Sequence, residues 1–154
     1  AMNTLKVGDK APQFEVRNQL NHSIRSEELA GKKYILFFYP RANTPGCTAE
    51  ACSLNDYYDQ LKSLGYEIFG VSEDTPEKQL KFQEKFNFRY DLLADTDHTL
   101  IDAYGVWGPK KFMGKEYDGL HRTTFLINEQ GVISHVIDKV RTKDHAQQLL
   151  ELLG

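Results

Sequence analysis

The hydrophobic positions in the first half of the chain predict alternating strands and helices. Residues 33–39 form a continuous apolar run that ends at Pro40, which is typical of a strand buried on both faces. Through residues 51–64 apolar positions recur every three or four residues and stop at a glycine, which indicates a helix. Residues 66–72 predict a second buried strand, and Pro76 after a threonine predicts the capped start of a second helix.

The second half of the chain continues the alternation and ends in a hairpin and a helix. We expect a short strand at Leu92 and Leu93, two strands at 124–127 and 132–137 around a tight turn, and a last helix capped by Thr142. The remaining expected features are a peripheral strand near 14–16, a turn and helix cap at 95–97, and an aromatic-rich loop containing Trp107, Phe112 and Tyr117. This order predicts an α/β protein with a thioredoxin-like fold, in which helices flank a central mixed β-sheet.

Composition narrows the class of protein without defining its function. The chain has 154 residues, 40% hydrophobic and 27% charged, which fits one domain over residues 3–154. We interpret Ala1 as an expression remnant before the start residue Met2. A net charge of -3 argues against nucleic-acid binding, and the chain has neither a signal-peptide pattern nor a long apolar stretch. We therefore expect a cytoplasmic protein that does not bind membranes.

Cys47 lies where a helix is predicted to begin. Thr44 is a suitable cap residue and Pro45 suits the first helical position, so Cys47 falls at the third. Backbone N–H groups there have no intrahelical partner, and with the positive end of the helix dipole they favour the nucleophilic thiolate. The loop also follows the strand at 33–39, and open α/β sheets bind ligands at the carboxyl ends of their strands. The alternative is a buried, inert cysteine.

Cys52 is the only other cysteine and lies five residues after Cys47. In an intact helix this separation places the two Cα atoms about 8 to 9 Å apart, whereas a disulfide needs less than about 7 Å. The two cysteines can therefore bond only if the helix opens. Their spacing differs from the C-x-x-C of dithiol reductases, and no histidine has suitable local spacing to complete a zinc site. We expect neither a metal nor a cofactor.

The run from Pro40 to Cys52, PRANTPGCTAEAC, resembles the active-site loop of the peroxiredoxins, specifically of the Q-type or bacterioferritin comigratory protein branch. The resemblance extends over nearly the whole chain, through Asp97-His98, YGVWG at 104–108, KEYDG at 115–119 and HRTTFLI at 121–127.

This resemblance implies a role for each matching residue. It implies that Cys47 attacks the peroxide and that Pro40, Thr44 and Arg122 complete the site. Arg122 would hold the peroxide and stabilise charge on the departing oxygen, and the Thr44 hydroxyl would add a hydrogen bond, whereas a surface ion pair and a helix cap are the plainer alternatives. Pro40 would supply an apolar wall without a competing donor.

The resemblance further implies a cycle within one chain. Cys47 would become a sulfenic acid and condense with Cys52 before irreversible oxidation, and thioredoxin or a similar dithiol protein would reduce the disulfide. Hydrogen peroxide and organic hydroperoxides would give water and alcohols. We expect a monomer, with a weak dimer as the alternative. The competing functions are a protein thiol-disulfide oxidoreductase and a redox-switched chaperone on the same fold. For His121 the sequence leaves two interpretations, a residue at the mouth of the site and a solvated loop histidine.

Overall fold

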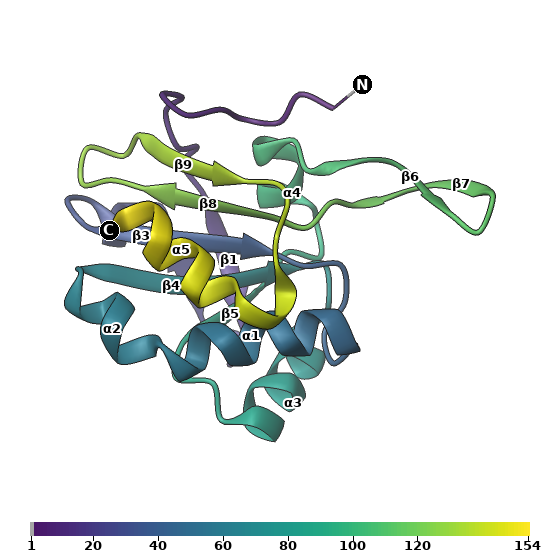
Figure 1. The fold of residues 1–154 in the computed structure, drawn as a ribbon, viewed down its shortest axis with the longest axis horizontal. Coiled ribbons are helices and arrows are strands. Elements are labelled where there is room, and N and C mark those ends of the chain that lie inside the picture. Colours follow the sequence, from purple (N-terminus) through teal and green to yellow (C-terminus); the bar gives the residue numbers. More distant parts are fainter. Residues whose placement is uncertain (1) are drawn as a thin grey trace.

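The computed structural model describes residues 2–154 and contains a seven-stranded mixed sheet with helices on both faces (Figure 1). The elements in chain order are β1 (Glu15–Asn18), β2 (Ser23–Arg25), the 3-10 helix η1 (Ser26–Leu29), β3 (Lys33–Phe38), α1 (Pro45–Asp56), α2 (Tyr58–Ser63), β4 (Tyr66–Ser72), α3 (Pro76–Phe86), β5 (Asp91–Ala94), α4 (Thr99–Tyr104), β6 (Trp107–Phe112), β7 (Lys115–Leu120), β8 (Thr123–Ile127), β9 (Ile133–Ile137), the 3-10 helix η2 (Thr142–Asp144) and α5 (His145–Leu153). The sheet order is β2-β1-β5-β4-β3-β8-β9, which confirms the predicted thioredoxin-like arrangement.

β3 lies inside the sheet and contributes side chains to a hydrophobic core on each face. Ile35 and Phe37 belong to the core that α1, α2, α3 and α5 cover, whereas Leu36 and Phe38 belong to the core on the α4 side. All four side chains are fully buried. Burial on both faces explains why residues 33–39 are continuously apolar instead of alternating with polar residues.

The strand register brings two distant parts of the chain to one edge of the sheet. β3 runs antiparallel to β8, and Phe38 pairs with Thr123. The chain that leaves the carboxyl end of β3 and the chain that enters the amino end of β8 therefore meet at the same place. This juxtaposition brings the loop before α1 close to Arg122, the residue that precedes β8.

The helices confirm the predicted boundaries at some ends and correct them at others. Thr75 caps α3 through a hydrogen bond from the Lys78 backbone N–H, as expected. The helix expected through residue 64 instead breaks at Tyr57, whose φ of -107° and ψ of 19° separate α1 from α2. The expected Thr142 cap is wrong, because residues 142–144 form the separate turn η2 and α5 begins at His145.

The aromatic-rich segment at 107–117 is not a loop but part of the β6–β7 hairpin. Its two turn residues, Met113 and Gly114, have φ values of 51° and 79°, as a two-residue hairpin turn of type I′ requires. The hairpin projects from the body of the molecule (Figure 1).

The expected cap at 95–97 is confirmed, because the Asp95 carboxylate accepts hydrogen bonds from the backbone N–H groups of Leu100 and Ile101. No helix within residues 2–154 has the length and apolar character needed to cross a bilayer.

Candidate active site

Cys47 occupies the third position of α1, as predicted from the sequence. Pro45 is the first helical residue and Thr44 stands at the cap position with extended backbone angles. Thr44 does not cap the helix with its side chain, however, because its hydroxyl donates to the carbonyl oxygen of Arg41 at 2.9 Å. The backbone N–H groups of Gly46 and Cys47 come before the first helical hydrogen bond, which Thr48 donates to Thr44.

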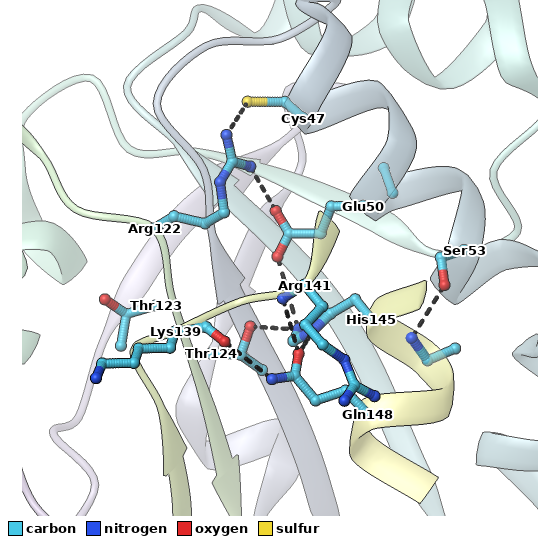
Figure 2. A network of polar contacts seen from close by, with 12 residues as sticks. Cys47, Glu50, Ser53, Arg122, Thr123, Thr124, Lys139, Arg141, His145 and Gln148 are labelled. Carbon is cyan, nitrogen blue, oxygen red and sulfur yellow. Dashed lines mark hydrogen bonds and ion pairs between the residues drawn. The ribbon is translucent and has the colours of Figure 1, made fainter. Parts of the chain in front are cut away.

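Arg122 lies in the connection between β7 and β8 and contacts the sulfur of Cys47. Its Nη2 lies 3.4 Å from the Cys47 Sγ, and its Nη1 donates to the Glu50 Oε1 at 2.7 Å (Figure 2). Burial disfavours the charged guanidinium, but Glu50 and Cys47 outweigh that effect and raise the pKa of Arg122. Gly46 lies directly against this side chain, since a Cβ there would approach the Arg122 Nη2 to 3.2 Å. The helix start thus leaves room for a fixed cation beside the sulfur.

Glu50 is the buried counterion of Arg122, and the sequence analysis did not identify it. Its side chain is fully buried, and burial raises the pKa of Glu50 to about 7 against the opposing effect of Arg122. Glu50 lies three residues after Cys47, so the two side chains share one face of α1. An acidic residue three positions after the cysteine, on a helix whose other residues were predicted to pack on the core, is the sequence signal that could have identified Glu50.

Cys47 is one of the residues that line an open pocket of about 830 Å³. Pro40, Thr44, Cys47 and Arg122 line it on the side of the sheet, which brings together four of the five residues expected in the site. The β6–β7 hairpin also lines the pocket, through residues that include Trp107, Lys110, Phe112 and Tyr117.

Lys110 is a second cation of this pocket that the sequence analysis missed. Its ammonium group donates to the Leu120 carbonyl oxygen at 2.9 Å. Burial and repulsion from Arg122 lower the pKa of Lys110, whereas Cys47 opposes that shift. His121 does not line this pocket but lines an adjoining groove, which shares Lys110 and Arg122 with the pocket, and its ring lies 3.0 Å from the Pro109 carbonyl oxygen.

Cys52, the fifth expected residue, does not line the pocket. It lies in the same unbroken helix as Cys47, and both cysteines are free thiols. Burial, with a smaller contribution from Asp56, raises the pKa of Cys52. The cation lies beside Cys47 and the thiol form is favoured at Cys52, so the two sulfurs are chemically unequal. Within residues 2–154 no three His, Cys, Asp or Glu side chains gather as a metal site would require.

A cysteine sulfur with a guanidinium beside it, in an open pocket, suits thiol chemistry on a small substrate that develops negative charge. The AhpC/TSA family model matches residues 7–136, so the chain belongs to the AhpC/TSA family.

Individual relatives narrow this assignment to one branch of the family. The chain is 45% identical over 152 residues to peroxiredoxin Bcp of Escherichia coli, covering 99% of this chain and 97% of that protein. Peroxiredoxin Q of Xanthomonas campestris superposes with a TM-score of 0.85 at 30% identity, covering 91% of this chain and 89% of that one. PrxQ of Xylella fastidiosa gives a TM-score of 0.91 at 25% identity, covering 98% and 96% of the two chains. The chain is a Bcp-type thiol peroxidase.

Proposed function

We propose that Cys47 is the nucleophile of this thiol peroxidase and that Cys52 closes a disulfide behind it. The observation that carries the proposal is the 3.4 Å contact between the Arg122 Nη2 and the Cys47 Sγ, two residues that line the open pocket. A guanidinium at that distance stabilises the thiolate and stays in place to stabilise the oxygen that leaves.

In the first step the Cys47 thiolate attacks the OH-bearing oxygen of a peroxide ROOH. An S–O bond forms, the O–O bond breaks, and the product RO⁻ takes a proton from solvent to leave as water or an alcohol. Arg122 and the Thr44 hydroxyl hold the peroxide in line with the sulfur, and the apolar face of Pro40 closes one side of the pocket. Cys47 is then a sulfenic acid, oxidised by two electrons.

In the second step the Cys52 thiol attacks the Cys47 sulfenic acid, which forms the S–S bond and releases water. The resulting disulfide is reduced by two electrons and two protons from thioredoxin or a similar dithiol protein. Hydrogen peroxide and organic hydroperoxides both fit this sequence, because only the O–O bond takes part in the chemistry.

Disulfide formation requires part of α1 to unwind. An unbroken helix holds the two Cα atoms about 8 to 9 Å apart, beyond the reach of a disulfide. Contacts from Arg122 to Cys47 and Glu50, and from the Tyr90 hydroxyl to the Ala51 carbonyl oxygen, hold the first half of α1 and must break when it opens. We expect the unwinding to run from about Pro45 to about Asn55, because this segment lies at the helix start and contains Gly46, a weak helix former.

We expect faster hydrogen exchange across residues 45–55 in the disulfide form than in the reduced form, with β3 and β4 equally protected in both. Hydrogen-exchange mass spectrometry on the two forms measures this directly, and β3 is the internal control. Equal protection of residues 45–55 in both forms, with the intramolecular disulfide present, would mean that the cysteines meet without local unwinding.

Replacing Cys52 by serine should separate the two steps. The Cys52→Ser variant is expected to react once with peroxide and then to accumulate sulfenic, sulfinic and sulfonic Cys47, because no thiol is left to condense with the first product. Mass spectrometry after stepwise additions of hydrogen peroxide follows these oxygen additions. Normal multiple turnover of this variant with thioredoxin would remove Cys52 from the cycle.

A further inference from the structure

On the side of Arg122 away from the sulfur, two fully buried ionisable side chains face each other. The Glu50 Oε2 and the His145 Nε2 lie 3.6 Å apart, and both side chains have 0% exposure (Figure 2). The Glu50 Oε2 has no hydrogen-bond partner at this distance. Leaving a buried carboxylate oxygen without a hydrogen-bond partner costs free energy, so the ionisable ring that faces it needs an explanation.

The hydrogen bonds around His145 determine which ring nitrogen carries the proton. Its Nδ1 lies 2.8 Å from the Gln148 Oε1, and that oxygen also accepts from the Arg141 backbone N–H. The Gln148 Nε2 donates to the Lys139 carbonyl oxygen, so the amide orientation is fixed and its Oε1 can only accept. His145 must therefore donate from Nδ1. Its Nε2 is the variable position, 2.8 Å from the Thr124 hydroxyl and facing Glu50.

If His145 is neutral, its Nε2 accepts from the Thr124 hydroxyl and offers no proton to Glu50, so an ionised Glu50 Oε2 would face this nitrogen at 3.6 Å without a donor. One added proton removes the uncompensated charge, because it can lie on the Glu50 Oε2, or on the His145 Nε2 so that the ring forms an ion pair with the carboxylate. Burial lowers the pKa of His145 to about 4 and raises that of Glu50 to about 7. Near neutral pH the shared proton therefore resides mainly on Glu50.

The Glu50–His145 pair is the group next to the Arg122 guanidinium whose charge can change. Glu50 faces Arg122 from the β7–β8 connection, and Cys47 lies one turn away on α1. Tyr90, the residue before β5, lies within the field of Glu50, and its hydroxyl donates to the Ala51 carbonyl oxygen. His145 additionally lies within the fields of Arg141 and Asp144, which pair with each other at 3.2 Å. The protonation of the pair decides whether the charge of Arg122 is compensated by Glu50 or is directed wholly at the sulfur.

We propose that His145 is a positioning residue for peroxide reduction, which shares one proton with Glu50 and thereby sets the charge that Arg122 presents to Cys47. This inference rests on the proposed roles of Cys47 and Arg122. With the proton bound, the Glu50 Oε1 still accepts from Arg122 as a neutral carbonyl, so the guanidinium keeps its place while its positive charge is uncompensated. With the proton lost, Glu50 neutralises Arg122, and the departing oxygen is stabilised less.

The pH profile of Cys47 oxidation tests the proposal. We expect the second-order rate constant with hydrogen peroxide, measured by rapid quenching and alkylation, to fall about threefold through an inflection near pH 7. His145→Gln supplies a permanent amide donor to Glu50, so its inflection should move down by about one pH unit, whereas apolar His145→Leu should move it up by about as much. Glu50→Gln should show no inflection in this range.

Ser53→Ala is the matched control, because Ser53 also joins α1 to α5 by accepting from the Ala146 backbone N–H but carries no titrating group. It should keep the inflection of the parent. A purely structural role for His145 would change the rate by the same factor at every pH and leave the inflection in place, and that result would overturn the proposal.

The infrared spectrum gives a second readout. The parent protein should show the band of a protonated buried carboxyl group near pH 6, and this band should be absent from Glu50→Gln. Persistence of the band in Glu50→Gln would also contradict the proposal. If peroxide fails to oxidise Cys47 in the parent, the proposed function itself fails, whereas normal oxidation with an unmoved inflection refutes only the role of His145.

Discussion

Replacing Cys47 by serine is expected to abolish peroxide consumption, with a loss of about a thousandfold or more, while the fold remains intact. A neutral hydroxyl in the same place is not ionised by the neighbouring guanidinium and cannot replace a thiolate as nucleophile. Serine is close to cysteine in size, and the side chain of Cys47 is buried against the core beneath α1, so the packing changes little. Steady-state peroxide consumption with thioredoxin as the reductant measures the loss.

Cys52→Ser is the matched control for this experiment, because it removes the other thiol of the same helix. In a single turnover without reductant it should consume about one equivalent of peroxide, whereas Cys47→Ser should consume none. Thermal unfolding of both variants establishes that the fold persists. Retained peroxide turnover in Cys47→Ser would assign the nucleophile to Cys52 and reverse the proposed roles of the two cysteines.

Arg122→Lys is expected to slow the oxidation of Cys47 by about 10- to 100-fold, a barrier increase of about 1.4 to 2.7 kcal/mol. The guanidinium makes two contacts at once, with the Cys47 Sγ and with Glu50, through two nitrogens held in one plane. A lysine ammonium is a single point on a flexible stem and would be drawn to Glu50, away from the sulfur. The quantity to measure is the second-order rate constant of Cys47 oxidation at constant pH.

Arg17→Lys provides the control for the arginine substitution, since Arg17 is exposed on β1 and its side chain donates to the Asn21 carbonyl oxygen. Its rate constant should equal that of the parent. If Arg122→Lys stays within about twofold of the parent, the guanidinium contributes little to the transition state and its contacts with Cys47 and Glu50 are only structural.

The sequence predicted those parts of the fold that depend on strong local patterns. The apolar runs of β3 and β4 and the Thr-Pro start of α3 identify these elements directly, and Thr44 with Pro45 gave the position of Cys47 at a helix start. The β6–β7 hairpin was missed because its strands are mostly exposed and its turn is Met113-Gly114, without the usual asparagine or aspartate.

The inner part of the site depends on contacts that no local pattern records. Cys47 and Arg122 come together through the pairing of β3 with β8, and only the resemblance to a known family linked them in advance. His145 reaches Glu50 because α5 packs across α1, and a histidine at the start of a terminal helix carries no sign of that partner. Burial also decides the protonation of both groups, and burial follows from the assembled fold.

The most direct test of the central claim is to map the bond that forms when one equivalent of hydrogen peroxide meets the reduced protein. After alkylation and denaturation, a protease specific for glutamate cuts after Glu50, between the two cysteines, and yields peptides 29–50 and 51–67. We predict that these two peptides remain joined until a reductant is added, and that the protein stays monomeric on a non-reducing gel. Separate peptides with Cys52 alkylated, or a disulfide between two chains, would contradict the proposed cycle.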